Sequence, residues 1–408
     1  MQASKIINDP VFGFINIPKG LLYDIVRHPI LQRLNRIKQV GLSSVVYPGA
    51  QHTRFQHSLG AFYLMSEAIQ HLQAKGNFIF DSEAEAVKAA ILMHDIGHGP
   101  FSHVLEDTIV QGISHEEISL MLMESINREF AGQLTLAIQI FKDEYPKRFL
   151  HQLVSGQLDM DRLDYLSRDS FYSGVSEGNI GAARIIKMLD VKNDQLVVES
   201  KGIYSIENFL VARRLMYWQV YLHKTSVAYE KMLVSTLLRA KELANMGVEL
   251  FASPALKFFL YNDINRERFK NDPECLEKFL LLDDNDIWTA LKVWCNHNDI
   301  ILSTLSQGMV NREVFKVEVS AQPPTEEQID VISERIANQL HISKKDSHYF
   351  ISTTSIEKNM YNPADDSIDI LYNDGSTTNI AEASDMLNIS VLSKKVKKYY
   401  LCYLREKK

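Results

Sequence analysis

The chain has 408 residues, of which 46% are hydrophobic and 23% are charged, and its formal net charge is −7. This length exceeds the size at which one hydrophobic core stops growing, so we expect a main domain with smaller parts attached. The negative charge balance excludes the basic footprint of a dedicated nucleic-acid-binding protein, and we expect no nucleic-acid partner.

The cysteines and the hydropathy pattern indicate the cellular setting. Cys275, Cys295 and Cys402 are widely spaced and form no Cys-x-x-Cys pair, which argues against both a disulfide framework and a thiolate zinc site. No stretch approaches the ~18 apolar residues of a membrane span, and the N-terminal residues lack the apolar segment of a signal peptide. We therefore expect a soluble, cytoplasmic protein with no membrane partner.

The first half of the chain is predicted to be mainly helical. Ser82 and Glu85 have the spacing of a capping box and open an alanine-rich segment, residues 84–93, which favours a helix. We expect that helix to end at His94, because glycines and a proline follow closely. Similar patterns predict helices at residues 59–72, 116–130, 131–141 and 147–157.

The middle of the chain is predicted to contain a hairpin followed by a long helix. A short strand is expected at residues 195–199, within a hairpin between Asp190 and Tyr204. Ser205 is then predicted to cap one helix that continues to about Asn245.

The sequence pattern changes after Arg312. Residues 252–305 keep a helical pattern, apart from a polar break at 262–271. Beyond Arg312, strands are predicted at residues 314–319, 349–353, 368–372 and 399–404, with a helix at 325–340. The predicted fold class is therefore mainly α, with a helical core and a smaller α+β C-terminal part. We divide the chain into a catalytic core at residues 1–245, a helical extension at 246–310 and an α+β C-terminal region at 311–408.

Histidines are concentrated in one part of the chain. Seven of the thirteen lie between His52 and His115. Histidine suits a functional site because its neutral ring binds metal ions and because it exchanges protons near neutral pH. The central feature is His94-Asp95 at a predicted helix end, where a turn can direct two adjacent side chains to one ion.

An upstream His57 and a downstream Asp161, each from another helix, would complete a metal site of two imidazoles and two carboxylates. This mixed set suits iron, manganese, zinc or magnesium, and it leaves positions for a water or a phosphate oxygen. The spacing alone does not identify the metal. An isolated His-Asp pair, moreover, more often has no metal role.

Six motifs resemble those of the HD-domain deoxynucleoside triphosphate (dNTP) triphosphohydrolases and follow the same order. They are Ile6-Ile-Asn-Asp-Pro, residues 32–41, residues 47–60 with Gln-His-Thr-Arg-Phe-Gln-His, His94-Asp-Ile-Gly-His-Gly-Pro-Phe-Ser-His, Ser114-His-Glu-Glu and Leu158-Asp-Met-Asp-Arg-Leu-Asp-Tyr. The resemblance is greatest to the branch with a sterile-alpha-motif domain, without a match to that domain itself. It implies an HD-domain helical core as the catalytic part.

The resemblance also implies roles for individual residues. The metal-ligand positions are matched by His57, His94, Asp95 and Asp161. Positions that contact phosphates or support the reacting centre are matched by Arg54, His98, His103, Arg162 and Arg213. His115 matches the general acid that protonates the departing nucleoside oxygen, and Glu116 matches the carboxylate that orients it.

Four further residues match the family's sugar and base contacts. Gln39 and Asp169 match positions that recognise the deoxyribose 3′-hydroxyl, whereas Tyr165 and Tyr221 match the aromatic wall around sugar and base. Such a wall would exclude a 2′-hydroxyl by crowding, because an unpaired hydroxyl against an apolar edge costs about 1–3 kcal/mol.

The resemblance implies activation by nucleotides, which occurs in the best-known branch, less strongly than it implies the catalytic roles. Phosphate or ribose contacts for an activator are expected at Lys5, Asn8, Lys201, His223, Arg312 and Lys316, and Gln32 matches one position that reads guanine. The residues that would read guanine match poorly, since Arg27 and Asn35 replace an expected Asp and Arg. An activator site made from such separate regions would require a homo-oligomer, a dimer or a tetramer.

Three functions are consistent with these residues. The leading hypothesis is a metal-dependent phosphohydrolase that cleaves dNTPs to deoxynucleoside and triphosphate. A second is an HD phosphohydrolase that acts on nucleoside monophosphates or other phosphoesters. A third is a non-catalytic sensor that binds nucleotides without turnover.

Overall fold

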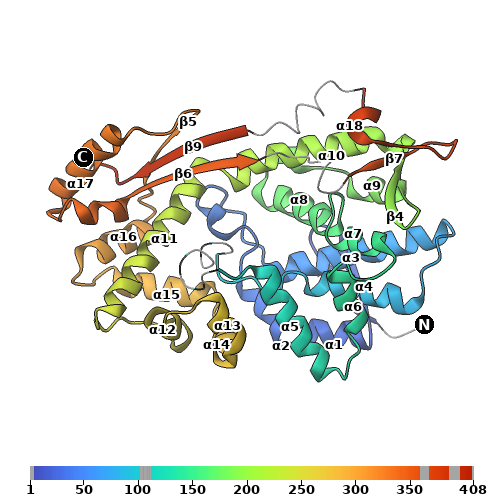
Figure 1. Ribbon diagram of the computed structural model, residues 1–408, viewed down its shortest axis with the longest axis horizontal. Helices are drawn as coiled ribbons and strands as arrows, with labels where there is room; N and C mark the ends of the chain where they lie inside the picture. Colours follow the sequence, from blue (N-terminus) through green and yellow to red (C-terminus); the bar gives the residue numbers. More distant parts are fainter. Residues whose placement is uncertain are drawn as a thin grey trace.

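The computed structural model describes residues 4–101, 104, 108, 110, 112–358, 367–385 and 396–406. It confirms the predicted fold class, because helices form the core and most strands lie in the C-terminal part (Figure 1). Among the described residues, no helix combines the length and the apolar character that crossing a bilayer requires.

The chain begins with a hairpin that the sequence did not predict. Strands β1 (Ser4–Asp9) and β2 (Gly13–Pro18) pair antiparallel. One carboxylate oxygen of Asp9 accepts the backbone N–H groups of Val11 and Phe12 and so holds the turn. The other oxygen accepts from Arg168 at 2.7 Å, which anchors the hairpin to the core.

Three helices form the centre of the core: α3 (Arg54–Ala74), α4 (Asp81–Met93) and α8 (Met160–Ser173). Helix α3 packs against both of the others. It begins five residues before the predicted start, at a Thr53–Gln56 capping box. A Cβ on Gly60 would lie 1.9 Å from the carboxylate of Asp164, so only glycine allows α8 to approach this closely.

The predicted Ser82 cap of α4 is wrong. The helix already begins at Asp81, because the Glu83 carboxylate accepts the backbone N–H of Phe80 at 2.8 Å and closes the first turn one residue earlier. Ser82 therefore lies inside the first turn. The predicted end is confirmed, since His94 is the C-cap residue.

Smaller helices surround this centre. They are α1 (Leu21–Arg27), α2 (Pro29–Arg33), α5 (His115–Glu129), α6 (Thr135–Phe141), α7 (Arg148–Val154) and α9 (Ala182–Met188). Helix α6 begins four residues later than predicted, because Ala131 and Gly132 have positive φ angles of 51° and 87° and end the preceding helix. Short 3-10 turns include η1 (Leu34–Arg36), η2 (Gly41–Val45), η4 (Ser176–Gly178), η5 (Ser200–Gly202) and η7 (Lys345–Phe350).

The single long helix predicted from Ser205 to Asn245 is wrong. The structure has α10 (Ile203–Met216), a π-helical turn (Tyr217–Tyr221) and α11 (Lys224–Asn245). The N–H of Leu222 reaches back five residues to the carbonyl of Tyr217 at 2.7 Å, and the ring of His223 then caps α11. The break turns the chain so that Tyr217 and Tyr221 line a cavity described below.

The extension that follows contains five helices. They are α12 (Pro254–Tyr261), α13 (Arg266–Asn271), α14 (Pro273–Leu281), α15 (Asp284–Trp294) and α16 (Ile300–Asn311). The predicted polar break at residues 262–271 is therefore partly wrong, because α13 lies within it. Asn265 caps this short helix by accepting the N–H of Arg268.

The C-terminal region contributes to two sheets. Strands β5 (Lys316–Ser320), β9 (Val396–Tyr403) and β6 (Ile351–Lys358) form an antiparallel sheet in that order, with α17 (Glu326–Leu340) beside it. The predicted hairpin is formed by β3 (Leu189–Lys192) and β4 (Gln195–Glu199). Strand β7 (Asp369–Leu371) joins β4 in parallel, followed by β8 (Thr377–Asn379) and the short α18 (Ile380–Ala383). The C-terminal region is thus bonded directly to the core.

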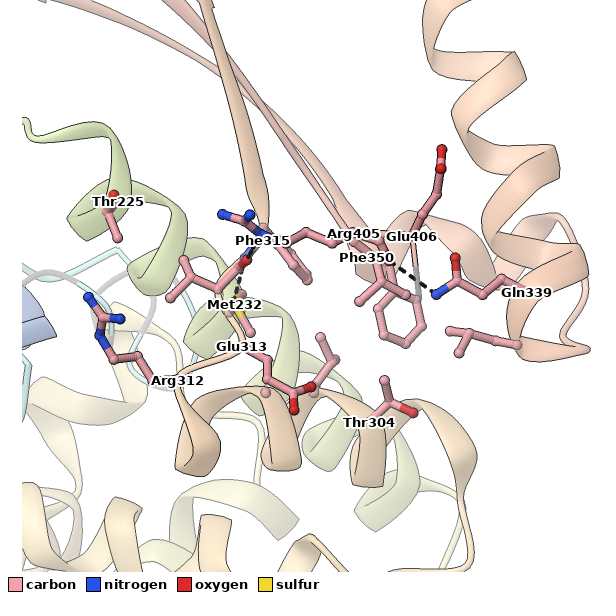
Figure 2. Close-up of a pocket in the computed structure, with 15 residues that line it drawn as sticks. Thr225, Met232, Thr304, Arg312, Glu313, Phe315, Gln339, Phe350, Arg405 and Glu406 are labelled. Carbon is pink, nitrogen blue, oxygen red and sulfur yellow. Dashed lines mark hydrogen bonds between the residues drawn. The ribbon is translucent and has the colours of Figure 1, made fainter. Parts of the chain in front are cut away.

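A cavity of about 560 Å³ lies where α11, α16 and α17 meet the ends of these strands. Figure 2 shows Arg405 extending toward Phe315, with Gln339 approaching it from α17. Arg405 Nε donates to the carbonyl of Val314 at 2.8 Å, and Gln339 donates to the carbonyl of Arg405. Among the residues that the structure describes, this cavity shares no lining residue with the one beside the histidine cluster.

The start of α15 is joined to two loops of the core. Arg33 is fully buried and donates to the carbonyls of His98 at 2.8 Å and Leu282 at 3.1 Å. The carboxylate of Asp284 accepts the backbone N–H groups of Lys38 at 3.0 Å and Phe101 at 3.2 Å. These bonds hold together loops that are far apart in the sequence.

We predict that Asp284→Ala lowers the free energy of unfolding by about 1–3 kcal/mol, because two backbone N–H groups, one buried and one part-buried, lose their acceptor. Chemical denaturation of the purified variants measures this change. Asp330→Ala, which removes an exposed ion pair with Lys344, is the matched control and should change stability by less than about 0.5 kcal/mol. Equal effects of the two substitutions would contradict the role given to Asp284.

Candidate metal centre

Three side chains from three helices converge at the centre of the core. His57 lies on α3, His94 follows α4 and Asp161 lies on α8; their donor atoms all lie within 4.8 Å of one another. His57 Nε2 is 3.1 Å from Asp161 Oδ1 and 3.2 Å from His94 Nε2. His94 Nε2 is 3.6 Å from the same Asp161 oxygen. This grouping could hold one metal ion.

Asp95 supplies a fourth donor at the edge of this group. Its Oδ1 is 3.4 Å from His94 Nε2 and its Oδ2 is 3.8 Å from His57 Nε2. The predicted turn explains this arrangement, because α4 ends at Met93 and the chain then bends so that adjacent side chains face one centre. Arg54 also donates to the Asp95 carboxylate, and His98 Nε2 lies 3.4 Å from it.

Neighbouring groups fix the orientation of both imidazoles. His94 Nδ1 donates to the carbonyl of Ile91 at 2.7 Å, and His57 Nδ1 lies 2.6 Å from the carboxylate of Asp164. With Nδ1 of each ring committed to an acceptor, a neutral ring turns the lone pair of Nε2 toward the centre, as a metal ligand must. Arg168 pairs with Asp164 at 2.9 Å and links it to the N-terminal hairpin.

The electrostatics of the cluster favour positive charge at its centre. Burial acts to lower the pKa of His57, but hydrogen bonds to Asp161 and Asp164 outweigh it and raise that pKa to about 10. Burial acts to raise the pKa of Asp161, but hydrogen bonds from His57 and His94 hold it well below the usual range. Carboxylates that stay ionised in a buried place attract a cation.

A cavity of about 550 Å³ opens beside the cluster, which is within the size range of small-molecule sites. Predicted site residues that line it are Gln39, Arg54, Asp95, His98, His115, Glu116, Asp161, Arg162, Tyr165, Asp169 and Tyr221. The sequence did not single out Phe101, Tyr217 and Glu230, which also line it. Arg213 is absent from the described lining and instead donates to Gln157 at 2.9 Å. His103 lies outside the described residues.

The predicted acid pair lies at one wall of this cavity. Ser114 caps α5, so His115 and Glu116 occupy its first turn. His115 Nε2 is 3.1 Å from Glu116 Oε1, and its ring stacks on that of His98 with 3.8 Å between centroids. The hydrogen bond with His115 lowers the pKa of Glu116 to about 2, so this carboxylate is ionised near neutral pH. Such a pair can hold and deliver a proton.

Another wall contains aromatic rings and a buried carboxylate. Asp169 accepts from the hydroxyl of Tyr221 at 2.6 Å and lies 2.6 Å from His52 Nε2. The rings of Tyr165 and Tyr217 pack edge-on against the ring of Tyr221, with centroid-to-centroid distances of 6.0 Å and 5.3 Å. Burial raises the pKa of Tyr221 well above its usual value, so its hydroxyl remains a neutral donor.

Two family models match the chain. The HD domain matches residues 54–169 and the HD associated region matches residues 180–252. The uncharacterized protein YwfO of Bacillus subtilis is 31% identical over 323 residues, which cover 78% of this chain and 72% of that protein. This chain belongs to the HD-domain phosphohydrolase family.

Other relatives extend the comparison. A solved phosphohydrolase from Bacteroides thetaiotaomicron has 80% identity and a TM-score of 0.97, and the match covers 99% of this chain and 100% of that one. The deoxynucleoside triphosphate triphosphohydrolase SAMHD1 of Homo sapiens is 29% identical over 59% of this chain and 45% of its own length. Its Dictyostelium discoideum homolog is 30% identical over 61% and 52%. The chain thus spans about half of these two named enzymes.

The HD-domain match covers His57, His94, Asp95 and Asp161, and so encloses the whole cluster. The sequence did not single out Asp164, Arg168 and His52. Asp164 holds the ring of His57, Arg168 pairs with Asp164, and His52 contacts Asp169. The four-residue spacing of Asp164 and Arg168 on one helix was an available signal. Nothing in the sequence indicated that His52 would contact Asp169, 117 positions away.

The residues expected to bind an activator lie on separate elements. Lys5 and Asn8 are on β1, Gln32 is on α2, Lys201 is in η5, His223 caps α11, Arg312 ends α16 and Lys316 begins β5. Several are engaged locally: Gln32 donates to Val26, Lys201 pairs with Glu199, and Arg312 donates twice to the carbonyl of Val45. The activator site stays a prediction.

We predict that His94→Ala and Asp161→Ala reduce the bound metal to below about a tenth of the native content, because each removes one of very few ligands. His115→Ala is the matched control, since it changes a histidine of the same cavity without removing a cluster residue. Metal per chain is measured by mass spectrometry after loading with iron, manganese, zinc or magnesium. Native metal content in His94→Ala would contradict the cluster as the metal site.

Proposed function

We propose that this HD-domain protein hydrolyses dNTPs to deoxynucleoside and triphosphate. The observation that carries the proposal is the arrangement of one cavity, in which the cluster residues Asp95 and Asp161, the pair His115–Glu116 and the wall of Asp169 and Tyr221 all contribute to the lining. The names of the human and Dictyostelium relatives give the same reaction for those enzymes. For this chain, the dNTP substrate is our proposal.

His57, His94, Asp95 and Asp161 would hold the divalent metal, because their nitrogen and oxygen donors already lie close together with the imidazoles oriented. Such a donor set fits iron, manganese, zinc or magnesium. When bound, the ion would stabilise negative charge on the reacting phosphate and favour attack by water.

Cationic side chains would bind the polyphosphate. Arg54 and Arg162 line the cavity beside the cluster. Arg162 is fixed by Asp159, whose carboxylate lies 3.2 Å from one guanidinium nitrogen and also accepts the backbone N–H of Arg162. A guanidinium held in this way can present its remaining N–H groups to phosphate oxygens without reorganising. His98 and Arg213 complete the proposed set. Burial lowers the pKa of His98 to about 3, so its neutral ring would act as a hydrogen-bonding group, while Arg213 lies outside the described lining of the cavity.

His115 would act as the general acid. Water adds to the α-phosphorus, the bond from phosphorus to the 5′ oxygen breaks, and that oxygen needs a proton to leave as a hydroxyl. The ionised Glu116 favours the protonated ring of His115 and orients it. His115 is 19% exposed, so a substrate in the cavity can reach the ring.

The wall that contains Asp169 and the aromatic rings would select the deoxyribose. Asp169 and Gln39 would bind the 3′-hydroxyl, and Tyr165 and Tyr221 would leave no room for a 2′-hydroxyl. The side-chain oxygen of Gln39 is buried and has no hydrogen-bond partner among the described residues, as expected of an acceptor that awaits a ligand hydroxyl. We further propose that any nucleotide activator binds between subunits of a dimer or tetramer.

Incubation of the metal-loaded protein with each dNTP, singly and mixed, tests the reaction, with products resolved by ion exchange. We predict release of deoxynucleoside and intact triphosphate in equal amounts. A requirement for mixtures would support an activator site. Turnover of deoxynucleoside monophosphates alone would favour the second hypothesis, and binding without turnover would favour the sensor.

We predict that Glu116→Gln moves the alkaline limb of the kcat–pH profile to lower pH by roughly one unit. The reason is that the native carboxylate, with a pKa of about 2, is charged throughout the working range and stabilises a protonated His115. The amide carries no charge, so the acid form of His115 is lost earlier as pH rises. An unchanged alkaline limb would contradict the proposed pairing.

A further inference from the structure

His52 connects three residues of the sugar-facing wall without being among the described residues that line the cavity. It precedes α3, and only 1% of the residue is exposed. Its backbone carbonyl accepts the N–H of Gln39 at 3.0 Å. Its ring Nε2 lies 2.6 Å from Asp169 Oδ1, and the second oxygen of Asp169 accepts from Tyr221. One buried residue thus fixes Gln39, Asp169 and, through Asp169, Tyr221.

The ring of His52 is held in a single orientation. It stacks on Tyr172, with 4.5 Å between centroids and 20° between planes. The hydroxyl of Tyr172 in turn accepts from the amide of Gln56 in the first turn of α3. The direction of the Nε2–H bond is therefore set by packing as well as by the carboxylate that accepts it.

The two ring nitrogens of His52 have different surroundings. Nδ1 is buried and has no hydrogen-bond partner among the described residues. The Asp169 carboxylate can only accept, so the contact at 2.6 Å requires a hydrogen on Nε2, which donates to Asp169.

We propose that His52 is the positioning residue for sugar recognition in this cavity. It holds the Asp169 carboxylate and the Gln39 backbone so that the side chains of both residues can reach the 3′-hydroxyl of one bound nucleotide. The inference rests on the proposed function and names the element that gives that site its preference for a sugar hydroxyl. His52 acts through its neighbours and does not contact the substrate.

The test compares two substrates that differ only in the 3′-hydroxyl, a dNTP and the 2′,3′-dideoxy analogue with the same base. His52→Asn and His52→Gln form a matched pair, because both carry an amide but only glutamine reaches the position of Nε2. We expect His52→Asn to lower kcat/KM for the dNTP roughly tenfold or more and to change that for the dideoxy analogue less than about twofold. His52→Gln should restore most of the native preference.

The outcomes separate this inference from the proposed function. Equal losses on both substrates, or native activity of His52→Asn on the dNTP, would overturn the positioning role while leaving the proposed reaction in place. A native protein that turns over no dNTP would overturn both. Metal content should be native in both variants, and a fall in metal content would also count against the proposal, because it would mean that His52 acts on the cluster.

Discussion

The structure depends on a buried aspartate that orients a metal-facing histidine. Asp164 lies between His57 and Arg168, so its charge is balanced from both sides while His57 Nε2 points toward Asp161. Burial without these partners would cost several kcal/mol per ion. Two further contacts keep this carboxylate paired and shielded from water. Helix α3 packs closely on α8 at Gly60, and the N-terminal hairpin is anchored on Arg168.

A second constraint shapes the aromatic wall of the cavity. The π-helical turn between α10 and α11 interrupts what would otherwise be one long helix, and it places Tyr217 and Tyr221 in the cavity wall. Such turns occur often at functional sites because they redirect side chains at little cost to the helix on either side. Asp95 and Asp161 of the cluster and the redirected tyrosines line one cavity, and this common lining supports our proposal of a nucleotide substrate.

Much of this arrangement could be predicted from the sequence, but not all of it. The motif around His94 and the upstream His57 predicted a cluster because ligand residue types recur at helix ends. The predicted start of α4 was wrong because the Glu83–Phe80 contact competes with the Ser82 cap. Local helix propensity does not show which of these two contacts forms. The role of His52 depends on a contact 117 positions away, and the parallel pairing of β4 with β7 joins segments that are still further apart in the sequence. Neither contact produces a local sequence pattern from which it could be predicted.

We propose that the cluster and the wall of Asp169 and Tyr221 act together in the hydrolysis of a dNTP at its α-phosphorus. Hydrolysis in water enriched with oxygen-18, followed by mass spectrometry of both products, tests it most directly. We predict that the label enters the triphosphate once and that the deoxynucleoside remains unlabelled. Label in the deoxynucleoside, or release of a deoxynucleoside mono- or diphosphate in place of triphosphate, would contradict the account.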